Sequence, residues 1–248
     1  IKNIYYNYDN GYLMIVYNNS NIDLIYDNKK VVNIPDLKNT IMMYSKSIND
    51  VAFGDNKIYL ATDFGLVILN DTKHEVYESY IYEKSFSKIL KVGSKLIALV
   101  DNTMYAAKIQ SGMYNFGNVW IPIDMGSVVV DKVSHMYTFN QEQALLACNE
   151  KSYIINVESS TITEQTTNYY YAKHINKTKT GHLISFSNNI RFVSGDVFAD
   201  NQINVLEVKS TDKAEIKDGY YSSYNAQNSV WCCSAAGVSN FQYSGGTV

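Results

Sequence analysis

The chain has 248 residues, of which 46% are hydrophobic, with 22 tyrosines and only 2 prolines. This composition excludes a disordered chain and a small disulfide-stapled one, because the apolar residues suffice for a sizeable core. The net charge is −3 and Arg191 is the only arginine, so the clustered basic side chains that bind nucleic acid are lacking. No apolar run approaches the roughly 20 residues that span a bilayer.

The chain opens at Ile1 without a basic leader region. We therefore expect it to be a mature or trimmed fragment, with no membrane span in this part.

A repeated strand pattern runs through the sequence. Residues 47–80 contain four β-prone runs separated by turn-forming residues at 54–56, 63–65 and 70–72, which predicts a four-stranded antiparallel sheet. The central pair of runs in this unit recurs five more times, as LMIVYNNSNIDLIY (13–26), LIALVDNTMYAAKI (96–109), LLACNEKSYIIN (145–156), LISFSNNIRFV (183–193) and VWCCSAAGVSNFQY (230–243).

These copies return at intervals of about 40–45 residues, the length of a β-propeller blade. We expect an all-β fold, a single β-propeller domain of four-stranded antiparallel blades over residues 1–248. The length allows six blades, and a seventh blade or a ring-closing strand from outside the chain stays open, because the last copy ends with its third strand at Tyr243. Residues 73–90 contain helix formers, but their β-branched and aromatic residues fit strands as well.

Proline and glycine are expected to mark the ends of strands and the turns between them. Asn33–Leu37 should end a blade, because Pro35 removes a ladder donor and fixes φ. Gly65 and Gly237 should supply positive φ in turns between second and third strands. The Asp63-Phe64-Gly65 sequence is therefore interpreted as a turn and not as part of a nucleotide site.

The candidate ligand contacts lie on the predicted rim, where inter-blade connections and the turns between second and third strands meet. Tyr44 and Lys46, on the first connection, are candidates for contact with an anionic sugar or phosphate. Tyr114 and Trp120 lie in a long insertion, 110–129, and are candidates for stacking on a sugar ring or a partner. The alternative is a loop that packs on its own apolar residues. We expect Lys46→Ala and Trp120→Ala to weaken binding without lowering the melting temperature, whereas loss of folding would make both structural.

No catalytic, metal-binding or cofactor-binding group is expected. The aspartates that suggest paired carboxylates are interpreted as backbone caps at strand ends and turns, and the histidines lack the spacing of a metal site; these residues are Asp23, Asp36, Asp50, Asp63, His74, His135, His174 and His182. Cys148, Cys232 and Cys233 form neither a zinc motif nor a disulfide framework. Cys232 and Cys233 are expected on opposite faces of a strand, with a strained vicinal disulfide as the alternative.

Several short motifs resemble one known family. They are the NIDL of Asn21–Leu24, the NIPDL of Asn33–Leu37, the KSIND of Lys46–Asp50 and the YLATDFG of Tyr59–Gly65. With them, the first 110 residues or so resemble the amino-terminal β-propeller of PorZ-type proteins, components of the type IX secretion system. The segment 230–243 is also similar to a strand pair of the propellers in hybrid two-component sensors.

The resemblance implies an exported protein of the periplasm, cell surface or outer membrane that has no catalytic activity. It would serve a complex that matures secreted cargo and attaches it to anionic lipopolysaccharide, with other secretion proteins, lipopolysaccharide or a glycan as partners. The alternative is the periplasmic, glycan-sensing propeller of a hybrid two-component regulator.

Overall fold

The computed structural model describes the chain except residues 110–117, 127–132, 149–150, 166–173, 178–180, 186–188, 195–204, 210–215, 225–226, 235–236 and 244–248. The chain divides into two compact units. The first comprises Ile1–Ser127 with Val157–Ser160, and the second comprises Val128–Asn156 with Thr161–Val248. Each unit is described by itself below.

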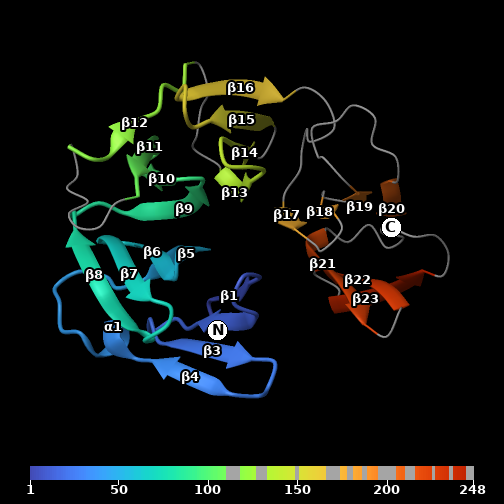
Figure 1. The fold of residues 1–248 in the computed structure, drawn as a ribbon, viewed down its shortest axis with the longest axis horizontal. Helices are drawn as coiled ribbons and strands as arrows, with labels where there is room; N and C mark the ends of the chain where they lie inside the picture. The colour runs from blue at the N-terminus through green and yellow to red at the C-terminus, as the bar shows by residue number, and fades with distance from the viewer. Residues whose placement is uncertain are drawn as a thin grey trace. The chain divides into compact units, whose positions relative to one another are not determined.

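The first unit contains three four-stranded sheets, whose strands lie side by side in chain order (Figure 1). The first sheet comprises β1 (Asn3–Asn7), β2 (Tyr12–Val16), β3 (Ile22–Tyr26) and β4 (Val31–Ile34). The second comprises β5 (Ile48–Gly54), β6 (Lys57–Thr62), β7 (Gly65–Asn70) and β8 (Glu75–Ile81). The third comprises β9 (Phe86–Val92), β10 (Lys95–Val100), β11 (Thr103–Lys108) and β12 (Ile121–Pro122).

The second unit holds further sheets built on the same plan. β13 (Val133–Thr138), β14 (Gln143–Cys148), β15 (Ser152–Asn156) and β16 (Thr161–Gln165) form one sheet. β17 (His174–Lys177), β18 (Gly181–Ser185), β19 (Asn189–Ser194) and β20 (Val205–Lys209) form the next. β21 (Ile216–Tyr224), β22 (Gln227–Ser234) and β23 (Gly237–Tyr243) form a three-stranded sheet.

The repeat predicted from the sequence is confirmed as the second and third strands of these sheets. All six predicted pairs are antiparallel neighbours: β2–β3, β6–β7, β10–β11, β14–β15, β18–β19 and β22–β23. In the second sheet Thr62 pairs with Gly65, so the connecting turn is Asp63-Phe64, and Gly65, predicted as the third turn residue, is the first residue of β7. Residues 73–90 form β8 and β9 for most of their length, which confirms strands over helix. Cys232 and Cys233 both lie within β22.

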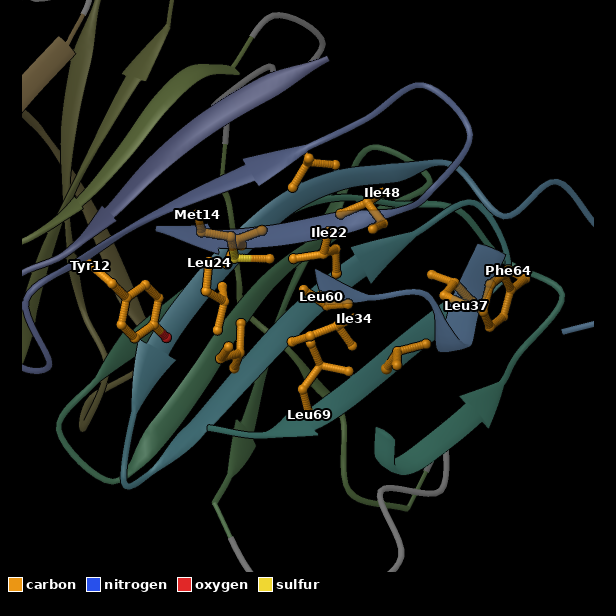
Figure 2. Packing of buried hydrophobic residues seen from close by; sticks show 14 residues of the cluster. Tyr12, Met14, Ile22, Leu24, Ile34, Leu37, Ile48, Leu60, Phe64 and Leu69 are labelled. Atoms are coloured by element: carbon orange, nitrogen blue, oxygen red, sulfur yellow. The ribbon is translucent and has the colours of Figure 1, made fainter. Parts of the chain in front are cut away.

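Burial within the first unit shows how its sheets stack. Ile58 and Leu60 of β6 pack in one hydrophobic cluster with residues of the first sheet, among them Met14 (Figure 2). Tyr59, on the opposite face of β6, packs in a second cluster with residues of the third sheet, among them Phe86. Because successive side chains of a strand point to opposite faces, β6 is buried on both faces. This stacking produces nearly continuous burial in place of the apolar and polar alternation of a one-sided sheet.

The end of the first sheet also agrees with the sequence. β4 ends at Ile34, and Pro35 caps a single helical turn, α1 (Asp36–Asn39). The Asp36 carboxylate accepts the Val76 backbone N–H at 2.9 Å, and Leu37 is buried. In the described part of the chain, no helix has the length and apolar character to cross a membrane.

Gly65 has a φ of 146°, as the turn requires. A Cβ atom at this position would lie 2.1 Å from the carbonyl oxygen of Tyr80. The position therefore needs glycine for two reasons, the backbone angle and the neighbouring strand. Gly237, the second glycine predicted for such a turn, is the first residue of β23.

Candidate functional site

One end of the sheets in the first unit gathers polar groups from segments far apart in the sequence. The segments entering β1, β5 and β9 meet there with the turns that follow β6 and β10. The same backbone bond occurs in two sheets: Asp63 N–H donates to Ser47 O at 3.2 Å, and Asp101 N–H donates to Ser85 O at 3.4 Å. We call this end the polar rim; it comprises Lys2, 44–49, Asp63, 83–85 and Asp101.

A chain of hydrogen bonds links the three sheets along the polar rim. The Lys2 ammonium donates to the Ser47 hydroxyl and, at 3.1 Å, to Asn49 Oδ1. Asn49 Nδ2 donates to Asp63 Oδ1 at 2.8 Å and to the Phe86 carbonyl at 3.1 Å. The Ser45 hydroxyl donates to the other oxygen of Asp63 at 2.5 Å. The rim therefore presents ammonium, amide, hydroxyl and carboxylate groups in fixed positions.

Asp63 accepts hydrogen bonds on both carboxylate oxygens, from Ser45 and from Asn49. Partial burial alone would raise the pKa of Asp63, but hydrogen bonds from Ser45 and Asn49, together with the Lys2 charge, lower it overall. The carboxylate is therefore ionised at neutral pH. From the sequence, Asp63 is interpreted only as a turn residue, because its hydrogen-bond partners come from other segments and no local motif predicts them.

Tyr44 lies on the rim, as predicted, and is 40% exposed. Its hydroxyl donates to Glu83 Oε1 at 2.6 Å. This hydrogen bond raises the pKa of Tyr44, so the phenol is neutral at physiological pH. The bond joins the segment before β5 to the segment before β9 and holds the ring at the surface.

Lys46 lies two residues from Tyr44, and its ammonium is turned toward the main chain. Nζ donates to the carbonyl of Lys38 at 2.6 Å and to that of Thr40 at 3.0 Å. The Ser20 hydroxyl donates to the Lys46 carbonyl at 2.7 Å. Lys46 therefore closes the loop that precedes it, a role that sequence reasoning missed because those carbonyls carry no sequence pattern.

The other two predicted contacts belong to the insertion at 110–129. Trp120 is 1% exposed, and its ring forms a T-shaped contact with the ring of Phe86 at a centroid distance of 5.3 Å. This burial fits a loop that packs its apolar residues inward, but the described partner, Phe86, belongs to β9 and not to the insertion. Tyr114 lies outside the described residues. The insertion also supplies β12, which pairs with β11; a two-residue strand containing Pro122 has no alternating pattern to predict it.

Two of the aspartates assigned to strand ends and turns lie elsewhere. Asp23 is within β3, and Asp50 is within β5, which corrects that placement. Asp50 Oδ2 accepts the Ile89 backbone N–H of β9 at 3.0 Å, so it still caps a backbone donor, but across two sheets. Burial of the carboxyl group raises the pKa of Asp50, against the opposing charge of Lys88. Within the described residues, no group of histidine, cysteine, aspartate or glutamate side chains could hold a metal ion.

Four-stranded antiparallel sheets that stack face to face and present turns at one end define the class of β-propeller-like domains. Residues 1–121 match the family described as "TSS9, PorZ, N-terminal beta-propeller domain". This match over the amino-terminal part of the chain confirms the resemblance found in the sequence. No curated protein sequence matches the chain.

Solved structures extend the likeness of fold over most of the chain. The type IX secretion component PorZ of Porphyromonas gingivalis is 18% identical with a TM-score of 0.71, and the match covers 97% of this chain and 30% of PorZ. The Cps50 (Swd1) β-propeller domain of Myceliophteria thermophila is 10% identical with a TM-score of 0.67, covering 96% of this chain and 82% of that one. The extracellular domain of the putative one-component system BT4673 of B. thetaiotaomicron is 11% identical with a TM-score of 0.61, covering 97% and 33%.

At these identities the likeness shows the fold alone. It supports a propeller-like arrangement of four-stranded sheets, while the single domain over 1–248 and its six or seven blades stay predictions. Since the chain spans 30% of PorZ, the activity and partners of a whole protein of that kind are taken up only as proposals.

Proposed function

We propose that this chain is a non-catalytic binding and scaffold module of a PorZ-like type IX secretion component at the cell surface. In this role it supports cargo maturation and attachment to anionic lipopolysaccharide. The observation that carries the proposal is the family match over residues 1–121. The description of the similar PorZ structure as an essential bacterial surface component of the secretion system supports the proposed location.

The polar rim is the proposed contact surface for the anionic glycan. Sugar hydroxyls both donate and accept hydrogen bonds, and the rim offers both kinds of partner: the Asp63 carboxylate accepts, and the Lys2 ammonium, which gives two of its three N–H groups to Ser47 and Asn49, can donate the third. Tyr44 adds a partly exposed ring on which a sugar can stack. Lys46 and Tyr44 stay proposed contacts, as does Tyr114. Trp120 would serve a ligand only by supporting the surface above it, because its side chain is buried.

The rim can be tested with a matched pair of lysines, one on the rim and one at the other end of the neighbouring sheet. In the full protein that carries this chain, binding to purified anionic lipopolysaccharide is measured for the wild type, Lys2→Gln and Lys57→Gln. Lys57 starts β6 at the end away from Asp63, so its substitution makes the same charge change off the rim. We expect Lys2→Gln to weaken binding several-fold, and more at low salt, with Lys57→Gln near the wild type. Equal binding by all three proteins would contradict the proposed surface, and no binding by the wild type would contradict the lipopolysaccharide role.

A second candidate function is the glycan-sensing propeller of a two-component regulator. The similarity of fold to the extracellular domain of BT4673, together with the 230–243 segment, favours it. A panel of neutral oligosaccharide fragments tested in parallel separates the two. Saturable binding to one fragment, with none to lipopolysaccharide, would replace the first proposal by the second.

A further inference from the structure

The loop between α1 and β5 exposes two large apolar side chains completely. Ile41 is 100% exposed and Met43 is 99% exposed, while the other exposed large hydrophobic residues of the described chain reach at most 67%. Single exposed apolar residues are ordinary. Two fully exposed apolar side chains separated by a single residue, in a segment whose backbone is held by hydrogen bonds, require a separate explanation. We call residues 40–43 the apolar loop.

Hydrogen bonds fix the apolar loop at both ends. At its start, the Thr40 backbone N–H and hydroxyl donate to the Asp36 carbonyl at 2.9 and 2.8 Å. At its end, the Lys46 ammonium reaches back to the carbonyls of Lys38 and Thr40. Tyr44 is held by Glu83. The exposed side chains therefore project from an ordered backbone and not from a flexible linker.

The hydrophobic core fixes the loop between these ends. Met42 packs against the cluster shared by the first and second sheets, and Leu37 of α1 is a buried member of that cluster (Figure 2). With Met42 inward, its neighbours Ile41 and Met43 are directed outward. An apolar surface that is already ordered loses little conformational entropy when it binds, which is the property of an interface anchor.

The charges beside the loop favour a protein partner over a lipid surface. Asp63 and Glu83 lie just beyond its carboxyl end, bonded to Ser45 and Tyr44. Residues 35–47 contain only two cations, Lys38 and Lys46, and the Lys46 ammonium is engaged by carbonyls. Adsorption to an anionic membrane requires a cluster of several lysines or arginines, and this segment has none.

From this arrangement we propose that the apolar loop docks into a partner protein, with Ile41 and Met43 entering an apolar pocket bordered by basic side chains that face Asp63 and Glu83. The partner is a different protein from this chain. Two side chains bury far less than the roughly 1,200–2,000 Å² of a specific interface, so they are the anchor of a wider contact. The proposal concerns a protein partner and does not rest on glycan binding, although Asp63 and Glu83 also belong to the polar rim.

Site-specific crosslinking locates the partner pocket. In cells producing the full protein, Met43 is replaced by p-benzoylphenylalanine, and Val31, which is 57% exposed on β4, is replaced in a matched control. We expect one protein to crosslink at position 43 and not at position 31. Mass spectrometry of the crosslinked peptide should show apolar residues flanked by lysine or arginine. The absence of a product at position 43, a product with a second copy of this chain, or a peptide without apolar residues would each overturn the proposal.

Affinity measurements with that purified partner then test the two side chains. Burial of one such side chain changes affinity by about ten- to hundredfold, so the double variant Ile41→Ser/Met43→Ser should bind at least about tenfold more weakly. Val31→Ser should bind like the wild type, and both variants should keep the wild-type melting temperature, since the altered side chains make no core contact. Unchanged affinity of the double variant refutes the docking role. Cosedimentation of the wild type with vesicles of phosphatidylglycerol and phosphatidylcholine, lost in the double variant, would assign the loop to a membrane instead.

Discussion

Replacing Trp120 by alanine is the sharpest test of whether the insertion serves binding or folding. Trp120 is 1% exposed and packs edge-on against Phe86 at 5.3 Å. Its Nε1 also donates to the Tyr82 hydroxyl at 3.4 Å. Truncation of a buried tryptophan removes its transfer free energy and leaves a cavity, a loss of about 3–5 kcal/mol. For a chain of this length, the loss corresponds to a fall in melting temperature of about 6–20 °C.

The assay is thermal unfolding of the wild type, Trp120→Ala and Trp120→Phe. Unfolding is followed by the circular dichroism band of the β-sheets. The phenylalanine variant keeps an aromatic edge against Phe86, so we expect it to lose less than half as much stability. Glycan binding is measured below the melting temperature of all three proteins. A Trp120→Ala protein with the wild-type melting temperature and lost binding would refute the core role and restore the tryptophan as a ligand contact.

Three further substitutions test the rim and the stacking of sheets. The Tyr12 hydroxyl donates to the buried Asp71 carboxylate at 2.6 Å. Tyr12→Phe should therefore lower the free energy of unfolding, measured by chemical denaturation, by about 1.5–3 kcal/mol. A loss below about 0.5 kcal/mol, the scatter of a neutral surface substitution, would contradict a stabilising role of this hydrogen bond. Asp63→Asn should lower the melting temperature at pH 7. The pKa of Asp63 is lower in the folded protein than the value of 3.8 expected in the unfolded chain, so the ionised carboxylate stabilises the fold at pH values above 3.8. That difference should vanish as the pH falls through the folded pKa, and a difference independent of pH would show that the carboxylate charge is irrelevant. Gly65→Ala should lower the free energy of unfolding by about 2–4 kcal/mol, and Gly11→Ala by about 1 kcal/mol. Both glycines have positive φ, but of the two only Gly65 has a backbone oxygen where the new Cβ atom would lie. Equal losses in the two variants would contradict the steric argument.

The strand pairs followed from the sequence because they are local. A turn such as Asp63-Phe64-Gly65 lies between two apolar runs that pair directly with each other, so residue type and spacing within about 15 residues hold the information. The blade ending at Pro35 is of the same kind, since a proline acts on its own backbone. The strand β12 escaped prediction because two residues carry no periodicity.

The polar rim was predicted in position but not in composition. Tyr44 and Lys46 were placed on a connection, and they lie there. The hydrogen-bond chain through Lys2, Asn49 and Asp63 could not be inferred from the sequence, because its bonds join residues up to 47 positions apart. An aspartate, asparagine or serine that takes part in such a chain has the same local sequence pattern as one that only caps a turn. The same holds for Asp50, whose backbone partner belongs to another sheet.

The sequence by itself therefore determined the strands, their order within each repeat and the resemblance of the amino-terminal part to one family. These depend on period-two patterning, turn chemistry and short motifs, which the chain carries residue by residue. Only the tertiary structure decided which face of a strand meets another sheet, that Trp120 is buried, that the Lys46 ammonium closes its own loop and that Ile41 and Met43 are exposed. Burial and hydrogen bonding depend on what the rest of the chain brings to a position, and the local sequence does not contain that information.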